Sequence, residues 1–109
     1  MKILFDQGVP VPLRKVISDH EVITAYEKGW SVLKNGELIM ASESSGFDLL
    51  ITTDQKLRYQ QNLKNRKIGI IVILSTSWPR IQKKTDRILQ AIKDFKPGMY
   101  VEIPIIDPA

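Results

Sequence analysis

The chain contains no cysteine and only one histidine, and both shortages exclude kinds of chemistry. Without cysteine the protein can form neither disulfides nor thiolate metal sites. The single histidine, His20, precedes an expected strand, and no serine or cysteine stands in a nucleophile elbow, so the sequence does not support a catalytic triad. The six glycines are scattered and form no phosphate-binding loop.

Long apolar runs and an export signal are also missing. No run approaches about 18 apolar residues, the length that indicates a membrane-spanning helix. The N-terminus has no charged segment followed by an apolar stretch and a small-residue cleavage site. We therefore expect one domain over residues 1–109, no membrane partner, and a cytoplasmic location, which fits the lack of cysteine.

The charged residues divide the chain into an acidic and a basic part. Residues 1–54 carry five Lys/Arg and eight Asp/Glu, whereas residues 55–96 carry eleven Lys/Arg and two Asp. The acidic part could supply metal ligands, and the basic part could bind a polyanion such as nucleic acid. A solvated charged surface explains the same distribution without either function.

Apolar patterning predicts strands and helices that alternate along the chain. The short runs that indicate strands are residues 2–5, 21–25, 48–53, 69–74 and 99–105. Local patterns between them predict helices over residues 12–17, 35–45, 55–63 and 77–95. Such alternation is typical of an α/β three-layer sandwich with a mostly parallel central sheet of about five strands. Pro104 fits only an edge strand, so the last strand should lie at an edge.

Two of the expected strands end on an aspartate followed by a glutamine: Asp6 follows KILF and Asp54 follows LLITT. In a parallel sheet ligands bind beyond the carboxyl ends of the strands, so the two carboxylates converge if these strands are neighbours. Carboxylates that share a crevice repel each other unless a cation lies between them, and Mg²⁺ or Mn²⁺ needs only two or three of them. Glu37, in the first turn of the helix expected from Asn35, is a third candidate ligand.

Each of these acids also has a purely structural explanation. Asp54 can cap the helix expected after it, and Asp6 can close the turn in DQGVP through an Asx-type hydrogen bond. Glu37 can complement the dipole of its helix, which Asn35 can cap. Under these explanations the matching positions of the two aspartates are a coincidence.

Three segments in this order carry a resemblance to the PIN domains: KILFDQGVP, KNGELIMA and LLITTDQKLRYQQN. The chain resembles most a small PIN-like family of prokaryotes. In that family a short strand ending in Asp opens the chain, and a strand ending in T-x-D follows an acidic helix start. The resemblance covers roughly residues 1–75 and, more loosely, the long helix expected near the C-terminus.

PIN domains are Mg²⁺- or Mn²⁺-dependent ribonucleases, and many are toxins paired with an antitoxin. The resemblance therefore implies that Asp6, Glu37 and Asp54 are catalytic metal ligands. Larger PIN domains carry a further acid on an early helix that this chain lacks; Glu21 and Glu27 lie near that position without its helical context. The protein partners to consider are an antitoxin and a second copy of the chain in a homodimer.

Two groups of polar side chains are candidates for binding RNA. The first lies within one helical turn beyond Asp54 and can hydrogen-bond phosphate or sugar: Arg58, Gln61 and Asn62. The second has the spacing of one helix face and forms a basic stripe that can follow a phosphate backbone: Arg80, Lys83, Lys84 and Arg87. Either group could instead be a solvated helix face, and the stripe could contact an acidic protein.

The sequence therefore predicts a metal-dependent endoribonuclease of PIN-like type, with the toxin of a toxin–antitoxin pair as one form of it. The alternative is a catalytically silent PIN-fold module that binds nucleic acid or a protein partner. The lack of the further acid favours the silent module, whereas the three acids that remain favour the enzyme.

Overall fold

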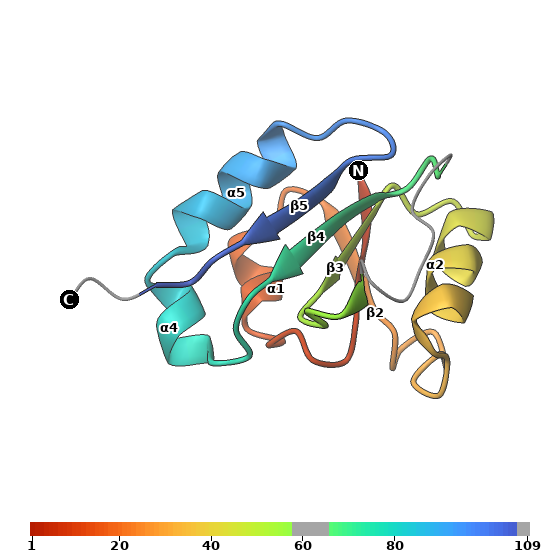
Figure 1. Ribbon diagram of the computed structural model, residues 1–109, viewed down its shortest axis with the longest axis horizontal. Coiled ribbons are helices and arrows are strands. Elements are labelled where there is room, and N and C mark those ends of the chain that lie inside the picture. Colours follow the sequence, from red (N-terminus) through yellow and green to blue (C-terminus); the bar gives the residue numbers. More distant parts are fainter. Residues whose placement is uncertain (58–65, 107–109) are drawn as a thin grey trace.

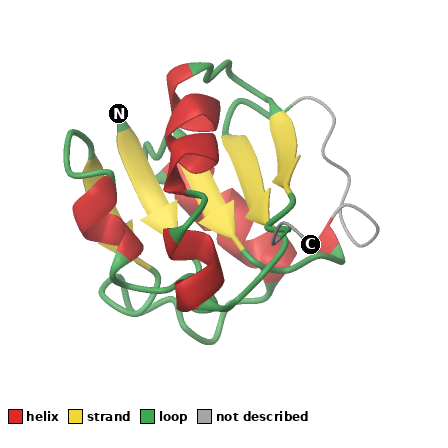
Figure 2. Cartoon of the chain, turned by 90° about the vertical axis from the view of Figure 1, so that its left-hand side faces the viewer, coloured by secondary structure: helices red, strands yellow, loops and turns green. Residues whose placement is uncertain are grey.

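The computed structural model describes residues 1–57 and 66–106, and within these ranges the chain forms a three-layer α/β sandwich (Figure 1). Five strands make one parallel sheet, and helices lie on both of its faces (Figure 2). The predicted fold class is confirmed. No helix in the described ranges is long and apolar enough to cross a membrane.

The strands lie close to where the apolar runs predict them: β1 (Lys2–Phe5), β2 (Glu21–Thr24), β3 (Leu49–Thr52), β4 (Gly69–Ile73) and β5 (Tyr100–Ile103). Their order in the sheet is β2-β1-β3-β4-β5, and every neighbouring pair is parallel. β5 is an edge strand, as predicted, and Pro104 follows its last residue. The missing amide of that proline therefore falls outside the hydrogen-bond ladder.

The helices that the structure describes are α1 (Leu13–Val16), α2 (Asn35–Ser44), α4 (Trp78–Gln82) and α5 (Thr85–Lys93). α2 matches the helix predicted from Asn35, and Gly46 follows it with a φ of +82°, in the left-handed region that glycine favours. The helix predicted over residues 55–63 falls mostly outside the described residues.

Alternate side chains of the central strands enter two separate apolar layers. Ile3 and Phe5 of β1 pack on one face with residues of α1, α4 and α5. Leu4, between them in the chain, packs on the opposite face with residues of α2. β3 and β4 are buried at every position, which is expected for central strands that are covered on both faces.

The prediction of one long helix over residues 77–95 was wrong, because this segment forms two helices. α4 ends at Gln82 and α5 begins at Thr85, with Lys84 between them at φ −126° and ψ 22°, outside the helical region. Ile81 and Ile88 are both fully buried. The positions halfway between them hold Lys84 and Thr85, so no apolar side chain joins the two helices into one buried stripe.

Truncation of Ile88 should show how much the packing of α5 on the sheet contributes to stability. Ile88→Ala should lower the free energy of unfolding by about 2–5 kcal/mol, because Ile88 is fully buried. Leu89→Ala is the matched control on the same helix and should cost less than about 1 kcal/mol, since Leu89 is 40% exposed. Urea unfolding measures both; equal losses would mean that α5 does not turn Ile88 towards the sheet.

Candidate metal and catalytic site

The two aspartates lie at one edge of the sheet, on neighbouring strands. Asp6 directly follows β1, and Asp54 lies two residues beyond Thr52, the last residue of β3. β1 and β3 pair in parallel, and the Asp6 N–H extends the ladder by donating to the Ile51 carbonyl at 2.9 Å. After β1 the next strand, β2, lies on one side in the strand order, and after β3 the next strand, β4, lies on the other side. Doubly wound sheets bind ligands at such a point, where the strand order reverses. The prediction that the two aspartates lie at the same edge of the sheet, after neighbouring strands, is confirmed.

The Thr52 hydroxyl connects the turns that carry the aspartates. It donates to Asp6 Oδ2 at 2.8 Å and accepts from the Asp54 N–H at 3.1 Å. Thr52 is 1% exposed, so water does not compete for these bonds. One buried side chain therefore fixes the orientation of the first carboxylate and the backbone of the second.

Each remaining carboxylate oxygen accepts a hydrogen bond from a neutral group. Asp6 Oδ1 accepts from the Gln7 N–H at 2.8 Å, and Asp54 Oδ1 accepts from the Lys56 N–H at 2.9 Å. Asp54 Oδ2 accepts from the side-chain amide of Asn35. The turn-closing roles considered for the aspartates are thus partly realised, and they leave each oxygen with lone pairs for another ligand.

No lysine or arginine in the described part of the chain forms an ion pair with either aspartate. Among the residues that the structure describes, the two half-buried aspartates at this edge therefore have neutral hydrogen-bond donors but no cationic partner. A hydrated Mg²⁺ or Mn²⁺ fits this all-oxygen set, since such ions keep several waters and take one or two carboxylates from the protein. Within residues 1–57 and 66–106, however, no three His, Cys, Asp or Glu side chains gather around a metal position.

Glu37 is the predicted ligand that the structure does not bring to the aspartates. Its Oε1 accepts from the Lys34 N–H at 3.4 Å, at the start of α2. The same side chain borders a groove along α2 with Met40 and Ser44, rather than the edge near Asp6. This contact corresponds to the structural explanation for Glu37, in which an acid complements the first turn of a helix.

Asn35 takes the position near Asp54 that we expected for an acid. Lys34, not Asn35, is the N-cap residue of α2, so Asn35 does not cap the helix as predicted. Its side chain is instead directed at the Asp54 carboxylate. The sequence signal for Asn35 as a cap was therefore misleading by one position, which is a common uncertainty at helix ends.

The predicted RNA-binding residues do not form one stripe on one helix. Lys83 and Lys84 lie in the break between α4 and α5, Arg80 is on α4, and Arg87 is on α5. Arg87 also lines a groove of about 590 Å³ between α5 and β5. The other predicted group, Arg58, Gln61 and Asn62, lies outside the described residues.

Glu27 is a further acidic residue near Asp6, and it was not selected from the sequence as a candidate site residue. Glu27, on the turn after β2, lines a cavity together with Asp6 and forms an ion pair with Arg14 at 2.5 Å. Thr24 and Glu27 exchange hydrogen bonds, with the Thr24 N–H donating to Glu27 Oε1 at 2.9 Å and the Glu27 N–H to Thr24 Oγ1 at 3.1 Å. The T-x-x-E spacing is the sequence signal that could have identified this turn.

The turns after β1 and β3 approach each other closely at Gly8, where a side chain would meet the hydroxyl of Thr53. A Cβ added to Gly8 would lie 2.2 Å from Thr53 Oγ1. Gly8→Ala should therefore lower the free energy of unfolding by about 1–3 kcal/mol. Thr53→Ala removes the oxygen and leaves the Thr53 Cβ at an ordinary 3.6 Å. The double variant should recover most of the loss in denaturant unfolding; no recovery would rule out the close approach as the cause.

The role of the Thr52 hydroxyl can be separated from its packing. Thr52→Val keeps the shape but removes the donor to Asp6 and the acceptor for the Asp54 N–H, so it should cost about 1–3 kcal/mol. The Asp54 amide should also exchange its hydrogen faster. Thr52→Ser loses a methyl group yet should keep slow exchange at Asp54. Unchanged exchange in the valine variant would show that the hydroxyl is not the acceptor.

Comparison of the chain with known protein families, with characterised proteins and with solved structures found no match. The resemblance to PIN domains therefore depends on the residues of the chain itself: an aspartate at the carboxyl end of β1, and a T-x-D aspartate beside it on β3.

Proposed function

We propose that the protein is an Mg²⁺- or Mn²⁺-dependent phosphodiester hydrolase of PIN type that cleaves RNA, with Asp6 and Asp54 as the metal ligands. The observation that carries the proposal is the placement of these two carboxylates at the carboxyl ends of the neighbouring strands β1 and β3, with no ion pair to a cationic side chain of the described residues. Two carboxylates at one half-buried edge repel each other, and a bound divalent cation removes this repulsion.

The chain's own residues would orient the ligands. Thr52 holds Asp6, and Asn35 holds Asp54, so each carboxylate keeps one orientation before substrate binds. A divalent cation there supplies a polarised phosphoryl oxygen and a bound water of lowered pKa, which is what phosphodiester hydrolysis requires. Glu37 is left out of this set because its carboxylate contacts the Lys34 N–H.

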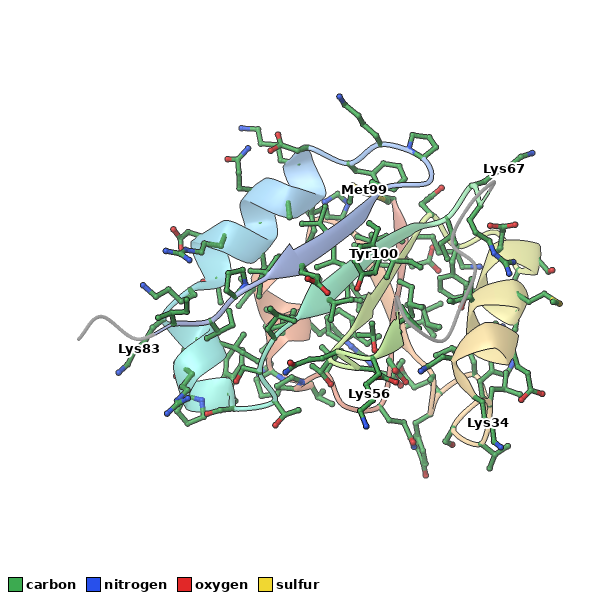
Figure 3. All side chains as sticks on the ribbon, in the orientation of Figure 1. Lys34, Lys56, Lys67, Lys83, Met99 and Tyr100 are labelled. Carbon is green, nitrogen blue, oxygen red and sulfur yellow. The ribbon has the colours of Figure 1, made fainter. Side chains whose placement is uncertain are left out.

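Basic side chains around the same edge support RNA as the substrate. Lys56 lies below the end of β3 in Figure 3, Lys34 lies at the lower right beside the start of α2, and Lys83 lies at the far left beside α4, whereas Lys67 lies at the upper right, near the start of β4. Cations near a phosphodiester site raise the local concentration of a polyanion. A cytoplasmic toxin neutralised by an antitoxin, and a homodimer, are forms of this proposal.

A silent nucleic-acid or protein-binding module is the second candidate. The observation that favours it is that only two carboxylates meet at the site, since no group of three potential ligands forms among the described residues. Both candidates predict RNA binding through the basic side chains, so cleavage and metal binding must be measured separately from RNA binding.

Metal binding should be visible in the thermal stability of the protein. Mn²⁺ should raise the melting midpoint of wild type, because it binds the folded site and removes the repulsion between Asp6 and Asp54. Asp6→Asn and Asp54→Asn should lose most of this shift, and Glu37→Gln is the matched control that should keep it. An equal shift in wild type and both aspartate variants would exclude these residues as ligands.

The cleavage test uses single-stranded RNA with Mg²⁺ or Mn²⁺, and EDTA as the negative control. Asp54→Asn should reduce cleavage by more than about 100-fold, since loss of even an outer partner of a metal ligand costs about 10–100-fold. RNA binding should persist in this variant. Binding by wild type with no cleavage under either metal would replace the hydrolase by the silent module.

The basic residues are tested with two variants of equal charge change. Replacing Lys83, Lys84 and Arg87 by Ala should flatten the salt dependence of RNA binding by about 2 in the log–log slope, roughly 0.7 for each phosphate contact. The control replaces Lys67, Lys93 and Lys96, which are exposed and lie where the chain leads into the N-terminal ends of β4 and β5, not just after the carboxyl end of a strand. Equal effects of the two triple variants would assign the binding to net charge alone.

A further inference from the structure

A cavity of about 480 Å³ lies beside Asp6, at the carboxyl ends of β1 and β2. We refer to it as the Tyr26 cavity; its lining includes Asp6, Val11, Arg14, Tyr26 and Glu27. Its volume is within the range of about 300–1,000 Å³ of small-molecule sites. Because Asp6 is shared, an occupant of this cavity would lie next to a group bound at the aspartates.

The turn that carries Tyr26 is fixed on both sides. The Ala25 N–H donates to the Phe5 carbonyl at 2.8 Å, which ties the turn to β1. The reciprocal hydrogen bonds between Thr24 and Glu27 enclose Tyr26. Glu27 is joined to α1 through both terminal nitrogens of Arg14, at 2.5 and 3.3 Å. Tyr26 is therefore presented by a preformed turn, and no ordering of this turn is needed when a ligand binds.

The ion pair between Arg14 and Glu27 does more for geometry than for stability. Hydrogen bonds from the Thr24 N–H and then from Arg14 hold the pKa of Glu27 below its usual value, so its carboxylate is ionised at neutral pH. The side chains are 35% and 47% exposed, and such surface pairs add little to stability. Their position at the cavity wall instead fixes the distance between α1 and the Tyr26 turn.

The Tyr26 side chain is exposed although its backbone is fixed. Tyr26 is 77% exposed, and Val11, also on the wall of the Tyr26 cavity, is 60% exposed. A single exposed apolar side chain is ordinary on a protein surface. Here two exposed side chains, Val11 and the aromatic Tyr26, border one cavity next to the proposed phosphate site. Aromatic rings in that position stack on the bases of single-stranded nucleic acid, with little dependence on the base.

We propose that the Tyr26 cavity binds one base of single-stranded RNA, stacked on the Tyr26 ring, next to the phosphate at Asp6 and Asp54. The proposal rests on the proposed function for the placement of that phosphate. It makes Tyr26 a positioning residue: the stacked base sets which phosphodiester reaches the two aspartates. Stacking without base-specific hydrogen bonds implies similar affinity for different sequences.

Binding is measured without metal, so that cleavage does not interfere. Fluorescence anisotropy of a labelled RNA hexanucleotide in EDTA gives the dissociation constant for wild type and variants. Tyr26→Ala should weaken binding by roughly 5- to 100-fold, the loss of one aromatic stack, whereas Tyr26→Phe should stay within about 2-fold of wild type. Leu89→Ala, an exposed apolar side chain on α5, is the remote control and should not change binding.

A second measurement locates the base in the wild-type protein. Titration with adenosine 5′-monophosphate in EDTA should shift the backbone NMR signals of Val11, Arg14 and Tyr26 and leave those of α5 unchanged. This result does not depend on whether the alanine variant folds. Shifts spread over the surface, or absent at these residues, would overturn the proposal.

The outcomes separate this inference from the hydrolase. If RNA is cleaved in an Asp54-dependent way but Tyr26→Ala binds RNA as wild type does, the base site is wrong and the hydrolase stands. If Tyr26-dependent binding is found but no cleavage with Mg²⁺ or Mn²⁺, the hydrolase is wrong and the base site stands. If wild type binds neither the hexanucleotide nor the nucleotide, the base site is overturned.

Discussion

The parallel pairing of β1 with β3 is the constraint on which the site depends. It brings together Asp6 and Thr52, which are 46 residues apart in the chain, and the Thr52 hydroxyl then joins the two turns across the strand pair. The same pairing brings the two turns so close that a Cβ at residue 8 would overlap the Thr53 hydroxyl. Asn35 adds a third connection when it reaches Asp54 from the start of α2. A change in the register of these strands would therefore displace both carboxylates and their partners at once.

Charge compensation distinguishes the acids at this edge. Glu27 is paired with Arg14 and bound by the Thr24 N–H, so its negative charge is already balanced within the fold. Asp6 and Asp54 have hydrogen-bond donors but no ion pair among the described residues. A carboxylate that already has an ion pair binds a further cation with little gain in free energy. Two carboxylates without ion pairs at one edge favour the cation in two ways, because it attracts both and removes the repulsion between them. This difference is why the proposed metal ligands are the two aspartates, and why Glu27 is assigned to fixing the Tyr26 turn.

The parts of the structure that follow from local pattern could be predicted from the sequence, and those that depend on side-chain direction could not. Apolar runs gave the five strands, and the edge rule for parallel sheets then placed Asp6 and Asp54 together. The break at Lys84 was missed because Ile81 and Ile88 are seven residues apart, a spacing that one helix also satisfies. Asn35 and Glu37 are two residues apart in one helical turn and therefore point in roughly opposite directions. The rotation of α2 about its axis decides which of them faces Asp54, and the sequence pattern does not determine that rotation. The turn at Tyr26 was overlooked because its T-x-x-E pair closes a turn rather than a helix.

The strand order also explains how an acidic and a basic part of the sequence come to share one edge. β3 ends the acidic part, β4 belongs to the basic part, and their parallel pairing brings the residues after each to the same side of the sheet. Lys56 stands four residues beyond the last residue of β3, and Lys83 directly follows α4, the first helix after β4. A polyanion at this edge therefore meets positive side chains from consecutive connections and two carboxylates that would repel it. Such a combination binds phosphate more tightly when a divalent cation covers the carboxylates. The proposed RNA binding at the aspartates and the proposed metal binding are therefore coupled, and each strengthens the other by the same free energy.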